Sequence, residues 1–237
     1  MNFFYLLLLA HVVGDFPLQN DAIFRLKQKS MTGVVVHVII FAAVALIILS
    51  PFLAQPVVWA TVFMLSVVHL LLDHLKVKMT RRQSGDRFRY FLADQALHIF
   101  FIGLAAYWLS QSMTDAAMPG LYANRRRLIS ANALIVAGFA GSVLLFYAEK
   151  LVIQRMGGDR LAAFPNQRQR WPGIIIRTIA AAGAIAGGWY TLLLLIIPLF
   201  VRLHPCWFHL LKPLWLHESL AHLLICTACA AWVWLGA

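Results

Sequence analysis

Charged residues are scarce in this chain, and acidic ones are the scarcest. Only 12% of the 237 residues are charged, and 9 Asp and Glu stand against 20 Lys and Arg, for a formal net charge of +11. Hydrophobic residues make up 62% of the chain, compared with roughly 45–50% in soluble domains. Together with a mean hydropathy of +0.77, this composition excludes an ordinary soluble domain and predicts an integral membrane protein.

Cysteine is rare, and no secretion signal is evident. Cys206, Cys226 and Cys229 lie near or within the last apolar segment, and an odd number in such places argues against a disulfide framework. Residues 1–13 have no basic stretch before their apolar run and no small-residue cleavage site after it. We therefore expect them to form a retained membrane span rather than a signal peptide.

Long apolar runs recur along the whole chain. They are residues 3–19, 33–50, 57–77, 88–110, 128–149, 173–201 and 209–235. At about 20 residues per span, they predict an all-α fold, a polytopic transmembrane helix bundle of about seven spans. The sixth run is long enough to tilt, or to break near Gly187 and Gly188, so about six to eight spans agree with the sequence. We divide the chain into a four-helix membrane part, 1–111, and a C-terminal membrane part, 112–237, with about three further spans.

The basic residues lie mostly between the apolar runs, which indicates membrane topology rather than nucleic-acid binding. If segment 20–32 faces the cytoplasm and the sides alternate from there, the inner segments hold 15 of the 20 Lys and Arg. This count includes Arg177 with the inner residues. The positive-inside rule then predicts an N-terminus outside and a C-terminus in the cytoplasm. The outer triplet Arg125–Arg127 is the exception.

Ionisable residues interrupt each of the first four apolar runs. They form three i,i+4 pairs and one single histidine: His11 with Asp15, His69 with Asp73, Asp94 with His98, and His37. Residues four apart on a helix point the same way, and the predicted topology puts all of these groups in one inner-leaflet layer. A carboxylate in mid-membrane costs roughly 2.5–3.5 kcal/mol, so we expect these groups to face one another, water or a cation.

A divalent metal site accounts for this layer best. Imidazole nitrogen and carboxylate oxygen suit zinc, which we favour, as well as manganese or iron, and the groups suffice for two ions. The predicted ligands are His11, Asp15, His37, His69, Asp73, Asp94 and His98, with Asp15, Asp73 and Asp94 also predicted to act in catalysis. Gln19, His74 and Gln95 are predicted to hold the ligands by hydrogen bonds. The alternative is a set of Asp–His hydrogen bonds between helices without any ion.

The last apolar run carries a second polar pattern. The sequence HESLAH at 217–222 has one residue more than the zinc-protease motif HExxH, which turns its two histidines about 140° apart and excludes that motif. Glu218, His222, Cys226 and Cys229 fall on one stripe of a helix. This stripe can bring a further ligand or proton carrier to the bundle, or it can simply be packed.

Residues 1–110 resemble a bacterial membrane family, domain of unknown function 3307. The resemblance rests on His11-x2-Gly14-Asp15-Phe16-x2-Gln19, a histidine early in the second span, His69-x3-Asp73, and Asp94-Gln95-x2-His98. It implies a multi-pass protein of the bacterial inner membrane and implies no activity, because the family has none established.

We predict a metal-dependent membrane hydrolase. Its substrate would be amphiphilic or lipid-linked, since a buried inner-leaflet site is reached most easily from the bilayer. A transporter of cations or protons is the alternative, although a transport pathway should carry polar groups at several depths. A structural subunit of a membrane complex is the third interpretation. The expected partners are membrane lipids, not nucleic acid.

Overall fold

The computed structural model describes residues 2–82, 87–113, 118–155, 166–197 and 215–236, and within these ranges every regular element is helical. The all-α prediction is therefore confirmed. The chain divides into two compact units, Met1–Leu128 and Ile129–Ala237. The predicted division of the chain into two membrane parts near residue 112 stays a prediction.

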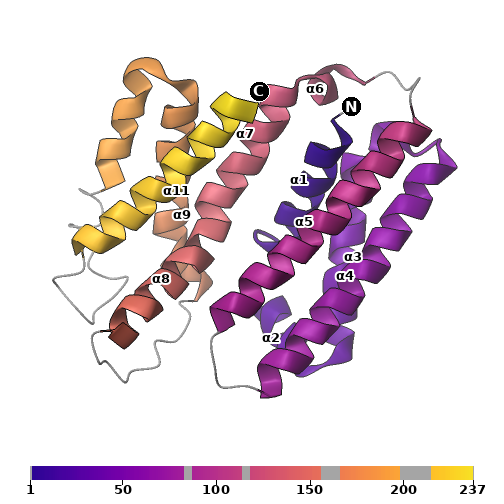
Figure 1. Ribbon diagram of the computed structural model, residues 1–237, viewed down its shortest axis with the longest axis horizontal. Coiled ribbons are helices and arrows are strands. Elements are labelled where there is room, and N and C mark those ends of the chain that lie inside the picture. The colour runs from indigo at the N-terminus through magenta and orange to yellow at the C-terminus, as the bar shows by residue number, and fades with distance from the viewer. Residues whose placement is uncertain (1, 83–86, 114–117, 156–165, 198–214, 237) are drawn as a thin grey trace. The chain divides into compact units, whose positions relative to one another are not determined.

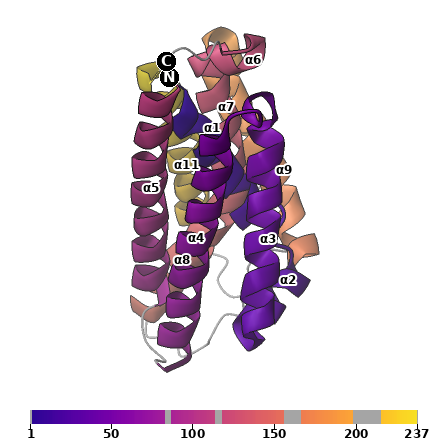
Figure 2. The ribbon, with the colours of Figure 1, turned by 90° about the vertical axis from the view of Figure 1, so that its right-hand side faces the viewer.

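Four helices of the first unit form a closed ring. They are α1 (Phe3–Asp15), α3 (Met31–Ile48), α4 (Pro56–Arg82) and α5 (Arg87–Ser112). Helix α1 packs against α3 and α5, and α4 packs against the same two helices. Figure 2 shows α3, α4 and α5 running side by side along their length. Each helix therefore directs one face toward the axis of the ring.

Helix α2 (Asp21–Lys29) is a short element that joins α1 to α3. Asn20 begins it by accepting hydrogen bonds from the backbone N–H groups of Ala22 and Ile23, both at 3.0 Å. Ser30 ends it and caps α3 by accepting from the N–H of Gly33 at 3.1 Å. A Cβ atom at Gly33 would lie 2.2 Å from the carbonyl carbon of Leu26. Glycine thus lets the end of α2 press directly against α3.

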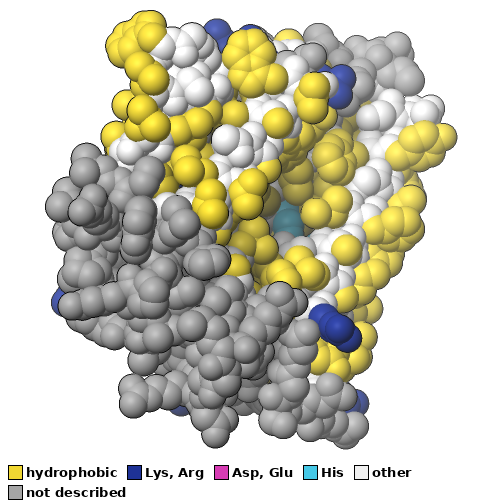
Figure 3. Space-filling view, turned by 60° about the vertical axis from the view of Figure 1, so that its left-hand side comes forward, with side chains coloured by type: hydrophobic (Ala, Val, Ile, Leu, Met, Phe, Trp, Pro, Cys, Tyr) yellow, Lys and Arg dark blue, Asp and Glu magenta, His cyan; other side chains and the backbone are white. Residues whose placement is uncertain are grey.

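Within the described residues, five helices are long and apolar enough to cross a membrane. They are Met31–Ile48, Pro56–Met79, Phe88–Ser112, Arg125–Ala148 and Ser219–Gly236, and the shorter apolar helix Phe3–Asp15 accompanies them. Large apolar side chains on their outer faces are exposed, such as Ile47 at 70% and Phe63 at 72%. On the face drawn in Figure 3, hydrophobic side chains cover much of the described surface. The chain is thus a multi-span membrane protein, whereas the count of seven spans stays a prediction.

Three segments pack together in the second unit. Helix α7 (Arg125–Ile135) continues through a π-helical turn, Val136–Ala140, into α8 (Gly141–Arg155). Helix α9 (Gln167–Ala186) contacts the π turn, and α11 (Trp215–Gly236) contacts α8 and α9.

The sixth apolar run does break. Helix α9 ends at Ala186, and Gly187 and Gly188 adopt positive φ angles of 76° and 59° before a 3₁₀ helix, Gly188–Leu195. Arg177, counted above with the inner segments, is instead fully buried inside α9. The positive-inside count therefore loses one of its inner residues.

Candidate metal centre

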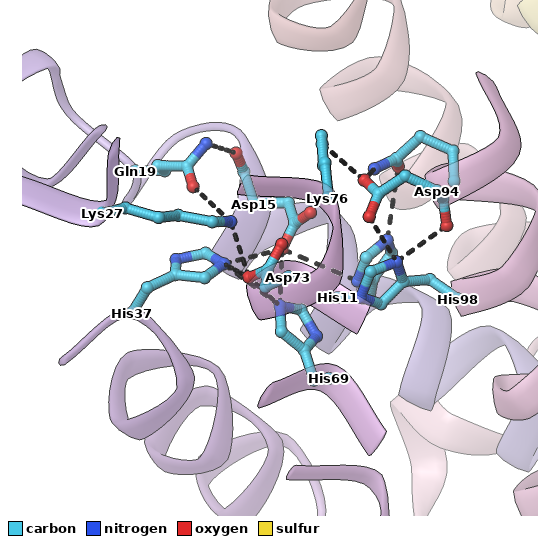
Figure 4. Close-up of polar contacts among 11 residues, drawn as sticks. His11, Asp15, Gln19, Lys27, His37, His69, Asp73, Lys76, Asp94 and His98 are labelled. Carbon is cyan, nitrogen blue, oxygen red and sulfur yellow. Dashed lines mark hydrogen bonds and ion pairs between the residues drawn. The ribbon is translucent and has the colours of Figure 1, made fainter. Parts of the chain in front are cut away.

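The ring encloses all seven residues that the sequence analysis selected as metal ligands. Each of the four ring helices contributes at least one of them (Figure 4). Their exposed fractions are 7% or less, and His37 and Asp73 are fully buried. The residues are His11 and Asp15 from α1, His37 from α3, His69 and Asp73 from α4, and Asp94 and His98 from α5. That these residues bind an ion stays a prediction.

Four donor atoms lie at the centre of this cluster: Asp15 Oδ1, His37 Nε2, His69 Nε2 and Asp73 Oδ2. The Nε2 atoms of His37 and His69 are 3.1 Å apart. Asp15 Oδ1 lies 3.2 Å from His37 Nε2 and 3.3 Å from His69 Nε2. Asp73 Oδ2 lies 3.4 Å from each of the same two nitrogens.

Three of these residues, His37, His69 and Asp73, form a group whose ligand atoms lie close enough together to hold one metal ion. Zinc bonds of about 2.0–2.1 Å place neighbouring tetrahedral ligands about 3.3–3.4 Å apart. The three separations among His37 Nε2, His69 Nε2 and Asp73 Oδ2 measure 3.1–3.4 Å. Three side chains from two helices therefore lie at separations that suit one such ion, and Asp15 Oδ1 lies beside both imidazoles.

A second part of the cluster lies around His98. Its Nδ1 is 2.8 Å from the carbonyl oxygen of Asp94, and because a carbonyl only accepts, Nδ1 carries the proton. The buried Nε2 then presents a lone pair, and within the described residues it has no hydrogen-bond partner. Asp73, Asp94 and His98 offer ligand atoms within 4.8 Å of one another, as do His11, Asp15 and His69. The cluster thus contains overlapping sets of groups that could hold a metal ion.

The cluster also includes two lysines, which the sequence analysis did not assign to it. Lys27 of α2 places its Nζ 2.6 Å from Asp73 Oδ2, and Lys76 of α4 places its Nζ 2.5 Å from Asp94 Oδ2. Lys27 is buried, whereas the Lys76 side chain is 25% exposed. Lys76 follows Asp73 by three residues on the same helix, and this spacing was a usable signal. Lys27 had none, because its contact depends on how α2 folds back.

The two predicted glutamines lie at the edge of the cluster. Gln19 accepts from Lys27 Nζ at 3.1 Å and donates to the backbone carbonyl of Asp15 at 3.2 Å. Gln95 donates to Asp94 Oδ2 at 3.2 Å, and its Oε1 lies 3.4 Å from His11 Nε2. His74, predicted for the same role, is exposed on α4.

The polar stripe of the last helix lies in the second unit. His222, Cys226 and Cys229 are buried on α11, and both cysteines are free thiols. The side chain of Glu218 and all of Cys206 lie outside the described residues. Cys226 donates to the backbone carbonyl of Arg177 at 3.5 Å. The stripe therefore packs against α9.

Arg177 is a charged residue of the second unit that the sequence analysis assigned to an inner segment rather than to a buried position. Its guanidinium donates to the carbonyl oxygens of Ala137 and Gly138, at 2.8 and 2.5 Å, and to Ser142 Oγ at 2.5 Å. A lone arginine within the apolar run 173–201 was the available signal.

Comparison with known proteins gives a family without an assigned activity. The family described as "Protein of unknown function (DUF3307)" matches residues 3–123, which is more than half of the chain and includes every cluster residue. No curated protein matches the chain, and no solved structure does.

Proposed function

The chain belongs to the DUF3307 family, and we propose that it is a metal-dependent hydrolase of the bacterial inner membrane, acting on an amphiphilic or lipid-linked substrate. The observation that carries the proposal is the group of donor atoms from His37, His69 and Asp73, which lie 3.1–3.4 Å from one another in a buried site. Zinc is the ion that this donor set fits best.

Buried polar atoms without hydrogen-bond partners support the presence of an ion. Among the described residues, they include His37 Nδ1, Asp73 Oδ1, Asp94 Oδ1 and His98 Nε2. Each such atom costs about 1–3 kcal/mol when it is left unsatisfied. Native proteins bury few of them, and several in one cluster indicate a bound ion or water.

The donor count suits catalysis. Catalytic zinc sites use three protein ligands and keep one position for water, and the bound ion makes hydroxide available near neutral pH. We assign His37, His69 and Asp73 as ligands. Asp15 contacts imidazoles and, among the described contacts, no ammonium group, so we assign it as the general base that accepts the proton of water.

The site lies toward the end of the ring at which α1 ends and α2 begins. Helix α4 ends and α5 begins at this same end, with Arg82 and Arg87 (Figure 1). The positive-inside rule places this end in the cytoplasm, with the N-terminus outside. A substrate embedded in the inner leaflet would reach the site without leaving the bilayer, and for this reason we propose a lipid-linked substrate.

A proton- or cation-coupled transporter is the second candidate, and the two lysine–aspartate pairs favour it. A buried ammonium group and a transported cation that alternate at one carboxylate form an arrangement suited to coupled transport. The concentration of ionisable residues in one layer favours a binding site over a pathway.

Metal analysis of the purified protein tests the proposal. We expect about one tightly held zinc ion per chain, and loss of the metal and of lipid hydrolysis in the double variant His37→Ala/His69→Ala. His74→Ala is the matched control, because this histidine lies beside Asp73 in sequence yet is exposed. A wild-type protein that retains no metal from metal-supplemented cells, or that hydrolyses no member of an ester, amide and phosphoester lipid panel, would contradict the proposal.

A further inference from the structure

Lys27 and the two imidazoles converge on a single oxygen atom. Asp73 Oδ2 lies 2.6 Å from Lys27 Nζ and 3.4 Å from the Nε2 atoms of His37 and His69. Oδ2 is the Asp73 oxygen that faces both imidazoles, so a dication bound by these imidazoles and Oδ2 would meet the ammonium group at this atom. The ion and Lys27 compete for one carboxylate.

Binding of a dication changes the net charge of the cluster. Asp15, Asp73 and Asp94 supply three negative charges, and Lys27 and Lys76 supply two positive ones. With neutral histidines the cluster has a net charge of −1, and a dication changes it to +1. A net positive charge in a buried site requires an anion nearby.

Lys27 has little freedom to leave once the ion has taken Asp73. Its side chain is 5% exposed, and the close contact of α2 with α3 at Gly33 holds the backbone of Lys27 in place. Its remaining described partner is the neutral Gln19. The ammonium thus becomes a buried cation in need of an anionic partner.

From these contacts we infer that the metal-loaded site binds a tetrahedral oxyanion, the phosphate group of a phosphorylated lipid, with Lys27 and Lys76 as its ammonium ligands. This inference rests on the proposed function and specifies its substrate class. Figure 4 shows Lys27 at Asp73 and Lys76 at Asp94, so the two ammonium groups approach different carboxylates of the cluster. A phosphate group has enough oxygens for two ammonium groups and a metal ion at once, whereas a carboxylate has two.

The more exposed Lys76 indicates where the substrate enters. Its side chain is 25% exposed, whereas the ligand side chains are nearly inaccessible. Hydrolysis of such a phosphomonoester balances without a co-reactant. The water oxygen bonds to phosphorus, the bond from phosphorus to the lipid oxygen breaks, and a proton passes through Asp15 to that lipid oxygen.

Binding of inorganic phosphate, measured by calorimetry, tests the inference on zinc-loaded and zinc-free full-length protein. We expect binding only when zinc is present. Lys27→Gln should weaken phosphate binding at least tenfold while zinc binding stays equal or becomes tighter, because the competitor for Asp73 is gone. Lys27→Arg should restore phosphate binding, and Lys29→Gln, a change at an exposed residue of the same helix, should leave it unchanged.

The outcomes separate the two proposals. Zinc binding without phosphate binding, or unchanged phosphate affinity in Lys27→Gln, overturns the inference and leaves the metal site intact. Absence of zinc from the wild-type protein overturns the proposed function itself. Competition by vesicles that contain phosphatidic acid, but not by vesicles of phosphatidylcholine alone, identifies the phosphate as a lipid headgroup. Competition by neither vesicle contradicts the lipid assignment.

Discussion

The two units of this protein bury charged groups in opposite ways. In Met1–Leu128, imidazoles, carboxylates and ammonium groups from five helices meet one another. In Ile129–Ala237, Arg177 donates to main-chain carbonyls of a π-helical turn and to one hydroxyl group. The first arrangement contains basic atoms that can take up a cation or a proton, whereas the second uses backbone oxygens that cannot change their charge.

This contrast separates a candidate metal site from a structural anchor. A π turn leaves carbonyl groups outside the regular helical hydrogen-bond ladder, and Arg177 supplies donors to Ala137 and Gly138 there. Gly141 makes room for the guanidinium, since a Cβ at this position would lie 3.0 Å from Arg177 Nε. In the ring of the first unit, the charged groups contact side chains from other helices rather than backbone carbonyl groups of an altered helical turn.

The largest expected effect concerns the metal-dependent part of the comparison. Addition of a strong chelator should lower the thermal stability of the wild-type protein, because a metal bound only to the folded state at about 1,000 times its dissociation constant contributes about 4.1 kcal/mol. Thermal unfolding in detergent measures the effect. His37→Ala/His69→Ala should show no response to the chelator. An equal response in both proteins would mean that the metal is not bound by these residues of the first unit.

Removing the buried charge of Arg177 in the second unit should destabilise the protein without changing its metal content. Arg177→Met leaves buried carbonyl groups without their donors, at an expected cost of about 2–4 kcal/mol, since hydrogen bonds to charged groups contribute about 1.5–3 kcal/mol each. Thermal unfolding and zinc content are measured together. If zinc is lost along with stability, the two units are not separable in the way described above.

A smaller effect is expected at the contact between α2 and α3. Gly33→Ala forces a methyl group against the backbone of Leu26 and Lys27, and overpacking of this kind costs about 1–3 kcal/mol. Phosphate binding to the zinc-loaded protein should weaken too, because Lys27 moves with α2. Gly103→Ala is the control, since a Cβ there meets no atom within 4 Å. Equal unfolding temperatures for the two variants would show that α2 yields without strain.

The smallest effect is expected from the hydroxyl group that binds Arg177. Ser142→Ala removes one of the three described acceptors of this guanidinium and should cost about 1 kcal/mol. Unfolding measurements on Ser142→Ala, Arg177→Met and the double variant give the coupling energy. Purely additive effects would mean that Ser142 does not act through Arg177.

Local patterns made much of the first unit predictable. The helical spans follow from apolar runs whose lengths suit a bilayer, and the i,i+4 spacing of His69 and Asp73 places both on one helix face before any partner is known. The helices α3, α4 and α5 begin and end near the predicted limits, although α4 extends past the predicted limit at residue 77 to Arg82. The supporting role predicted for His74 rested on its position beside Asp73 in sequence. Asp73 is buried whereas His74 is exposed, because neighbouring residues of a helix point in different directions.

The sequence by itself determined that this is a helical membrane protein and which ionisable residues its first four spans carry, since composition and helical spacing are local properties of the chain. Only the tertiary structure decided that Lys27 reaches Asp73, that His37 and His69 share two carboxylates, and that Arg177 is buried in α9 rather than lying in a loop. These contacts depend on the fold of α2, the order of helices around the ring and a π turn. Each brings together side chains or backbone groups whose separation in sequence gives no sign of their distance in space.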